Sequence, residues 1–158
     1  MICNGYMYDV LHGISDHAKL QIVLNAVEKG SNPWGCTDYL NQKKKILETG
    51  ADVYELMNDY PVHTKAVLIN DRLSVVGSYN LDMRSTYLDT ELMLVIDSEK
   101  LNQQIHETES DYMEKSKEVL ANGQETEGAK YQGKVLNRKK KLYYGVLRII
   151  IRPLRQLL

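Results

Sequence analysis

The chain has 158 residues, of which 43% are hydrophobic, and a formal net charge of −1. This length and composition allow one core of ordinary size and make a second full domain unexpected. The near-neutral charge excludes a global electrostatic attraction to nucleic acid or membrane, so any such attraction must come from a local patch.

The cysteines and the first residues of the chain bear on its location. Cys3 and Cys36 are too few for a disulfide framework, and neither belongs to a Cys or His cluster of the kind that binds zinc. Residues 1–12 lack the basic and apolar segments of a signal peptide, and no apolar run approaches the roughly 18 residues that span a bilayer. We therefore expect a cytoplasmic protein that meets membranes only peripherally.

Short apolar runs alternate with turn residues along the first hundred residues, which is typical of an α/β domain. Residues 20–26 are apolar and partly β-branched, so they predict a buried strand. Thr37 or Asp38 could cap a helix that runs through Leu47, and Gly50 marks its end. Further strands are predicted at residues 53–57, 65–69, 73–77 and 91–97.

The second half of the chain predicts a hairpin, a helix and a tail. Residues 70–72 read Asn-Asp-Arg and predict a tight turn between two strands. Ser98 would cap a helix that runs to about Leu120. The following segment is polar and contains glycine, which indicates a linker. The expected parts are a domain over residues 1–120, a linker over 121–136 and a basic tail over 137–158.

One stretch, from His63 to Glu91, combines residue types that suit phosphodiester chemistry. His63 and Lys65 lie two positions apart at the start of a predicted strand, so their side chains would point to the same face. A neutral imidazole can attack phosphorus, while the Lys65 ammonium and the Asn80 amide could hold the non-bridging oxygens. A carboxylate such as Glu91 could hydrogen-bond the far ring nitrogen and fix the histidine tautomer.

The His-x-Lys spacing has little weight alone, because His17 and Lys19 form a second copy of it. A lone histidine on a strand is also more often an ordinary core residue. Only the copy at His63 is followed by Gly-Ser-Tyr-Asn at residues 77–80 and then by a glutamate, with apolar strands between them. This combination favours a catalytic site.

The stretch resembles the HxK...GSxN motif of the phospholipase D superfamily, closely over residues 63–91 and loosely over residues 20–97. The string GSYNLDMRS at residues 77–85 is most similar to the cardiolipin synthase branch. The resemblance implies a phospholipase D-type α/β/α sandwich with a mixed sheet, and a phosphohistidine intermediate formed without metal or other cofactor. It implies that His63 is the nucleophile or acid and that Glu91 orients a histidine. The residues that it places around the phosphate are Lys65, Ser78 and Asn80, and those near a substrate pocket are Asp82, Arg84 and Ser85.

The chain departs from the family pattern in two ways. The family has Asp seven residues after the motif His, whereas this chain has Asn70 followed by Asp71; we expect the turn to tolerate Asn, with loss of activity as the alternative. The family's active site also uses two motifs, one His attacking and the other protonating the leaving oxygen, and this chain has one. Either two copies build the site together, or the chain is the C-terminal half of a longer enzyme. Residues 1–11 favour the second interpretation, because they leave too little room for the strand and helix expected before Leu20.

The tail over residues 137–158 holds seven basic residues and no acidic ones. A helix would align Lys141, Arg148, Arg152 and Arg155 in one stripe, opposite apolar residues that include Leu147 and Leu154. Such a helix suits the surface of an anionic bilayer and would bring a phospholipid substrate close. The alternative is a helix that packs on a second half or subunit. Nucleic acid fits less well, because many apolar residues separate the charges.

Taken together, the motif and the tail predict an enzyme that acts on phospholipid phosphodiesters. It would hydrolyse them or transfer phosphatidyl groups between alcohols, as cardiolipin synthase-like enzymes do, and would supply one of two motif halves. One alternative is a nuclease, because the same chemistry cleaves nucleic-acid phosphodiesters. The other is a catalytically silent remnant that serves as a membrane-binding or assembly module.

Overall fold

The computed structural model describes residues 3–157, except for the side chains of residues 155–157. Its helices are α1 (Gly5–Ser15), α2 (Pro33–Glu48), α3 (Met83–Tyr87), α4 (Glu99–Glu114), α5 (Arg138–Ile150) and the 3-10 helix η1 (Arg152–Leu157). Its strands are β1 (Gln21–Asn25), β2 (Asp52–Leu56), β3 (Ala66–Ile69), β4 (Leu73–Gly77), β5 (Met93–Asp97), β6 (Ser116–Val119) and β7 (Glu125–Glu127). The predicted α/β class is confirmed.

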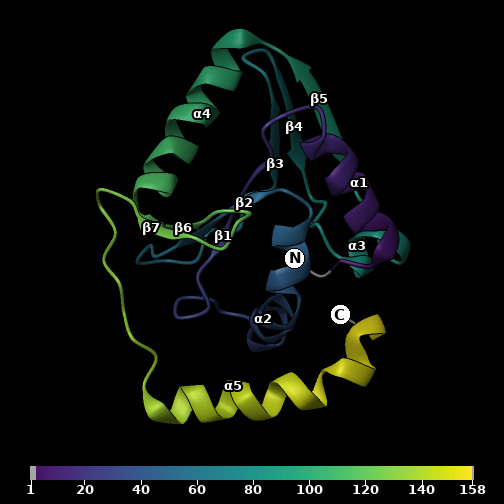
Figure 1. Ribbon diagram of the computed structural model, residues 1–158. Coiled ribbons are helices and arrows are strands. Elements are labelled where there is room, and N and C mark those ends of the chain that lie inside the picture. The colour runs from purple at the N-terminus through teal and green to yellow at the C-terminus, as the bar shows by residue number, and fades with distance from the viewer. Residues whose placement is uncertain (1–2, 158) are drawn as a thin grey trace.

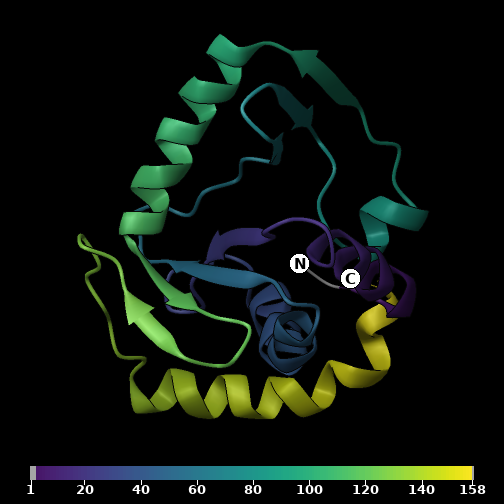
Figure 2. The ribbon, with the colours of Figure 1, turned by 45° about the horizontal axis from the view of Figure 1, so that its top comes forward.

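The strands form two separate sheets (Figure 1). The first has the order β1-β2-β6-β7, and it is the predicted mixed sheet because β1 and β2 are parallel whereas the other pairs are antiparallel. The second is an antiparallel sheet with the order β3-β4-β5. Figure 2 shows the three-stranded sheet standing apart from the four-stranded one, with α4 connecting the two.

The main hydrophobic core lies between the four-stranded sheet, α2 and α5. α2 begins where the Asn32 side chain accepts hydrogen bonds from the amides of Trp34 and Gly35, with Pro33 at a first-turn position. α2 lies against one side of the sheet, and α5 lies outside α2 (Figure 2). The buried members of this core are Val27, Tyr39, Ile46, Val53 and Tyr144. We call the four-stranded sheet with α2 and α5 the body.

A smaller core holds the N-terminal helix against the start of α3. Met7 and Leu11 are buried there four positions apart on α1, and Met83 packs against them. The Asn4 side chain caps α1 by accepting a hydrogen bond from the Met7 amide. Of the strand and helix that were expected not to fit before Leu20, the described residues form the helix, as α1, but no strand.

The strands predicted from apolar runs are confirmed to within two residues at each end. The turn between β3 and β4 is confirmed as well. Asn70 has a φ of +52° there, a left-handed conformation that asparagine adopts more readily than most residues. The helix prediction for the region before Gly50 was also correct, although α2 begins earlier, at Pro33.

The region after α4 differs from the prediction. The helix capped by Ser98 ends at Glu114 rather than near Leu120, because residues 116–119 pair with β2 as β6. The expected linker over residues 121–136 contains β7, which extends the same sheet. The sequence of β6 reads Ser-Lys-Glu-Val and has no apolar run, so its strand pairing is not visible in the hydrophobic pattern.

The basic tail forms a helix as predicted, but it is not separate from the domain, because Tyr144 of α5 belongs to the main core. Leu147, which the prediction places on the membrane side, is buried, and Arg148 is hydrogen-bonded to α2. The side chain of Arg155 lies outside the described residues. Across residues 3–157, none of the helices combines the length and apolar character needed to cross a membrane.

Candidate active site

His63 and Lys65 lie together just before β3. The Lys65 carbonyl accepts a hydrogen bond from the Gly77 amide at 3.2 Å, which extends the pairing of β3 with β4. The Lys65 ammonium lies 3.0 Å from Nδ1 of His63 and 3.2 Å from its Nε2. An ammonium can only donate hydrogen bonds, so the ring nitrogen that it contacts acts as the acceptor. The structure thus brings the two motif residues together on one face, as the spacing predicts.

Gly77 and Ser78 end β4 beside these residues. A Cβ atom on Gly77 would collide with the Leu92 carbonyl oxygen, so the close approach of the backbones explains why glycine occupies this position. The Ser78 amide donates to the Leu92 carbonyl at 3.0 Å, and the Leu92 amide donates to Ser78 Oγ at 3.0 Å. Ser78 is therefore fixed between β4 and the start of β5.

Glu91 is held by hydroxyl groups. Its carboxylate accepts a hydrogen bond from Ser78 Oγ. That bond, followed by a hydrogen bond from Ser85 and by the charge of Lys65, lowers the pKa of Glu91 below its usual value. Among the described residues, His63 contacts Lys65 and Glu91 contacts serines, so the predicted hydrogen bond between Glu91 and the imidazole is not formed.

Asn80 and Ser85 form the other side of the site. The backbone amide of Asn80 donates a hydrogen bond to Ser85 Oγ at 3.2 Å, and Ser85 is buried. Asp82 caps α3 by accepting a hydrogen bond from the Ser85 amide at 2.8 Å. Arg84 instead forms an exposed ion pair with Asp89, 3.1 Å from Nε to Oδ2. Of the predicted pocket residues, Ser85 therefore contacts the site, Asp82 positions Ser85, and Arg84 lies on the surface.

Asn70 and Asp71 lie at the opposite end of β3 from the histidine. A strand rises about 3.3 Å per residue, so the seven positions from His63 to Asn70 correspond to roughly 23 Å along an extended chain. Asn70 therefore belongs to the turn, and its difference from the family's Asp does not alter the groups around His63.

Asn25, which no sequence motif singles out, holds the segment before His63. Asn25 ends β1, and its side chain donates to the Val62 carbonyl at 2.7 Å and accepts from the Val62 amide at 2.8 Å. This paired contact ties the motif segment to the four-stranded sheet. The only sequence signal is a polar Asn at the end of an apolar run.

The site lies at one end of an open apolar face. Side chains alternate along a strand, so Val67 points to the same face of the three-stranded sheet as Lys65, whose carbonyl extends the pairing of β3 with β4, and Lys65 in turn contacts His63. The register places Val67 opposite Val75 and Val75 opposite Val95. Val67 is 54% exposed and Val95 is 70% exposed, although β-branched residues in strands usually pack against a neighbour. We call this row the open face.

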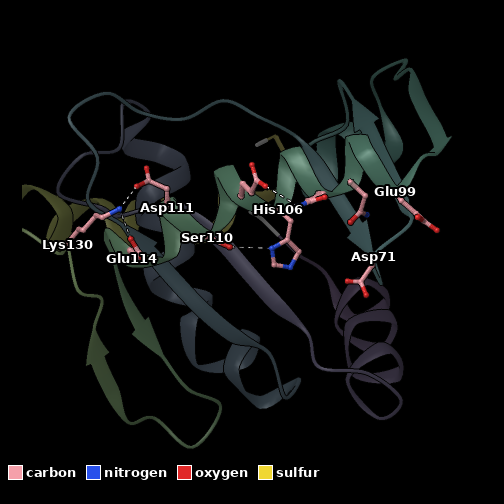
Figure 3. A pocket seen from close by; sticks show the side chains of 10 residues that line it. Asp71, Glu99, His106, Ser110, Asp111, Glu114 and Lys130 are labelled. Atoms are coloured by element: carbon pink, nitrogen blue, oxygen red, sulfur yellow. Dashed lines mark hydrogen bonds and ion pairs between the residues drawn. The ribbon is translucent and has the colours of Figure 1, made fainter.

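A separate groove of about 710 Å³ runs along α4 (Figure 3). Its lining residues all carry polar or charged side chains. Lys130 reaches across it to Asp111 at 3.0 Å and to Glu114 at 2.6 Å, and His106 contacts Ser110. Within residues 3–157, no group of three or more His, Cys, Asp or Glu side chains is placed to hold a metal ion. The groove shares only Asp71 with the predicted site residues.

Comparisons with known proteins agree with this geometry. The chain matches the family model described as the cardiolipin synthase, phospholipase D-like domain over residues 6–111. It is 32% identical to cardiolipin synthase A of Proteus mirabilis over 135 residues, which cover 82% of this chain and 26% of that protein. It is 30% identical to cardiolipin synthase A of Serratia proteamaculans over 135 residues, with the same two shares. The chain therefore spans about a quarter of the length of these curated relatives.

Among solved structures, the chain is similar to Nuc, a phospholipase D family member from Salmonella typhimurium, with a TM-score of 0.49 and 14% identity. The similarity covers 76% of this chain and 90% of that one. The region matched by the family model spans more than half of the chain and includes His63, Lys65, Ser78, Asn80 and Glu91. The chain belongs to the cardiolipin synthase, phospholipase D-like domain family.

Proposed function

We propose that this chain supplies one catalytic half of a phospholipase D-type enzyme that hydrolyses phospholipid phosphodiesters or transfers their phosphatidyl groups to an alcohol. The observation that carries the proposal is the arrangement of His63, Lys65, Ser78 and Glu91 on adjoining strand ends in a member of this family. The substrate class follows from the cardiolipin synthase relatives, of which the chain covers about a quarter.

The proposed reaction has two displacements at phosphorus. A ring nitrogen of His63 attacks the phosphorus, a P–N bond forms, and the bond to the leaving alcohol oxygen breaks. Water or a second alcohol then attacks the phosphohistidine and gives its proton to the group that had protonated the leaving oxygen, and the P–N bond breaks as the imidazole leaves. Lys65 would offset the negative charge on the non-bridging oxygens, and the side-chain amide of Asn80 would donate a hydrogen bond to them. Ser78, whose hydroxyl donates to Glu91, would lie beside the phosphate. The leaving oxygen takes its proton from an acid outside this motif.

We propose that this acid comes from a second motif-bearing half, either in a second copy of the chain or in a preceding half of a longer enzyme. Two observations support a missing neighbour. The open face continues directly from His63 and leaves Val67 and Val95 uncovered. The curated relatives are also about four times as long as the matched segment. A half that covers the open face would bring its own residues to His63.

We further propose that the enzyme works at the surface of an anionic membrane. The support is the basic helix α5, in which Lys141 is exposed, and the exposed Arg152 of η1. Arg148 is already committed to α2, and the side chain of Arg155 is not described. A membrane-bound enzyme would meet phospholipid substrate without extracting it into water.

The first test uses phosphatidylglycerol and the purified full chain, with solution mass measured by light scattering. Turnover by a dimer would support a shared site, and His63→Ala should abolish it. His17→Ala is the matched control, because His17 belongs to the second His-x-Lys copy and should leave turnover unchanged. Cleavage of DNA in place of phosphatidylglycerol would favour a nuclease.

A second test does not need the other half. A bis-nitrophenyl phosphodiester has a leaving group that departs without protonation, so the nucleophile alone can react. We expect a phosphoryl adduct on His63, seen by mass spectrometry together with release of nitrophenol, in the wild type and in His17→Ala but not in His63→Ala. A chain that neither turns over phosphatidylglycerol nor forms this adduct would be the catalytically silent remnant.

A further inference from the structure

α5 has a buried inner side that faces α2. Tyr144, Leu147 and Ile151 are buried at positions three and four apart, as expected for one side of a helix. The Arg148 guanidinium donates to the Asn41 side chain at 2.9 Å, and Asn41 donates to the Arg148 carbonyl at 3.0 Å. The helix is therefore firmly docked by its inner side.

The opposite side of α5 is apolar and exposed. Its exposed residues each lie two positions from Tyr144 or Leu147 along the chain, which is a rotation of about 200° around the helix. They are Leu142, Val146 and Ile149. Leu142 is 72% exposed and Ile149 is 71% exposed. We call these three residues the outer ridge. Large apolar side chains gathered on the free side of a docked helix indicate a surface that meets an apolar phase or partner.

Cationic residues lie beside the outer ridge and in the first turn before it. Arg138 and Lys139 share its side of the helix, Lys141 lies on the flank, and Lys140 lies toward the inner side. Residues 137–158 contain no acidic residue, so nothing in the same segment neutralises these cations. None of them forms an ion pair with the part of the chain that the structure describes. An apolar ridge set among unneutralised cations matches the two layers of an anionic bilayer, its hydrocarbon boundary and its headgroups. The exposed cations are Arg138, Lys139, Lys140, Lys141 and Arg152.

Helix α1 provides an internal comparison. It also exposes apolar residues on one side, Tyr6, Val10 and Ile14, which lie four positions apart. Its charged neighbours are Asp9 and Asp16, so the surface around this ridge repels an anionic membrane. Both helices thus expose apolar side chains, but only α5 also carries the positive charge that an anionic bilayer attracts.

We propose that the outer ridge of α5 enters the headgroup boundary of an anionic bilayer while the inner side stays packed on α2. This changes which residues face lipid: Leu147 and Arg148 hold the helix on the domain, and Leu142, Val146 and Ile149 enter the membrane. η1 continues from α5 and contacts α3, the helix that carries Ser85 (Figure 1). The membrane-bound helix is therefore joined by one short segment to the catalytic loop. The inference rests on the proposed function for its biological setting, but membrane binding is measurable without turnover.

The test is co-sedimentation of the full chain with vesicles of phosphatidylcholine alone or of phosphatidylcholine with phosphatidylglycerol. We expect binding to the anionic vesicles that weakens with added salt. Leu142→Ser/Val146→Ser/Ile149→Ser should lower this affinity by roughly tenfold or more. Lys139→Gln/Lys141→Gln should lower it by roughly thirtyfold and weaken the preference for anionic lipid, since each cation near the surface contributes about 1 kcal/mol.

Matched controls separate this inference from its rivals. Val10→Ser/Ile14→Ser removes apolar exposure from α1 and should leave vesicle binding unchanged, and circular dichroism checks that each variant is folded. His63→Ala should bind like the wild type, so failure of the catalytic proposal leaves this test intact. Absence of binding to anionic vesicles would overturn the proposal. Normal vesicle binding by the outer-ridge variant would also overturn it. This holds even if light scattering shows that the variant is monomeric where the wild type is a dimer.

Discussion

The body and the three-stranded sheet differ in how they use apolar residues. In the body, Ile46 and Val53 are fully buried between the sheet and α2. In the three-stranded sheet, Val67 and Val95 are equally apolar but remain exposed. The apolar side chains of the body are therefore covered within the described chain, whereas those of the open face are not. Similar residues thus stabilise the body but leave the open face available for contact.

The largest expected effect is on the free energy of unfolding, when the same substitution of isoleucine by alanine is made in each region. Ile46→Ala should lower the free energy of unfolding by about 2–5 kcal/mol, because it leaves a cavity in a closed core. Ile69→Ala, on the open face, should cost less than about 1 kcal/mol in the isolated chain, because the side chain is 45% exposed. Urea unfolding measures both values. Equal costs would mean that the face is covered in solution, and a dimer in light scattering would then identify the cover.

A smaller effect concerns the ionic network inside the body. Glu55 accepts a hydrogen bond from Tyr39 at 2.8 Å and forms ion pairs with Lys43 at 2.8 Å and Lys117 at 3.2 Å. Burial alone would raise the pKa of Glu55, but Lys43, Tyr39 and Lys117 together lower it below its usual value. Glu55→Gln should cost about 2 kcal/mol, since it leaves the half-buried Lys43 and Lys117 with Glu125 as their remaining anionic partner.

The pH dependence of stability follows from the same carboxylate. Because its folded-state pKa is depressed, the network's contribution is fully present above the unfolded pKa of about 4.3 and is lost as the pH falls through the folded pKa. The wild type should therefore lose more stability than Glu55→Gln between neutral pH and acid pH. Parallel acid dependence of the two proteins in urea unfolding would contradict this assignment.

The smallest of the three effects concerns the connection between the regions. Asn25→Ala removes both hydrogen bonds to Val62 and should cost about 1–2 kcal/mol. The loss should be local, so the Val62 amide should exchange with solvent faster while the amides of β2 keep their protection. Asn122→Ala is a control, since its side chain contacts only Gln124 in an exposed turn. Unchanged exchange at Val62 would show that Asn25 does not hold the motif segment.

The sequence predicted the parts of the fold that follow from apolar runs and local turn chemistry. The strands around Val53 and Val75 and the turn at Asn70 belong to this group. β6 was missed because its Lys117 and Glu118 are charged, and their pairing depends on Glu55 and Tyr54 of a strand sixty residues earlier. Such a strand is specified by partners and not by periodicity.

The membership of the candidate site stays a prediction, and the structure shows contacts that the motif alone did not indicate. His63 contacts Lys65, Ser78 contacts Glu91, and Asn80 contacts Ser85. The partner of Glu91 differed, because the hydroxyl of Ser78 is closer along the paired strand ends than the imidazole. The open face could not be predicted, because an apolar strand has the same sequence pattern whether its cover lies in the same chain or in another.

Tyr144 gives the tail a consequence for how the protein could be regulated. The ring of this residue fills the same core as Tyr39 and Val53, on the inner side of the helix whose outer ridge we assign to the membrane. Cleavage before α5 would therefore not release an intact folded domain, because loss of the Tyr144 side chain would leave a cavity in the main core. The inner side of α5 completes the core, and its outer ridge is the side that we assign to the membrane. Detachment from a membrane would have to come from a change in lipid charge or salt, and not from removal of the anchor.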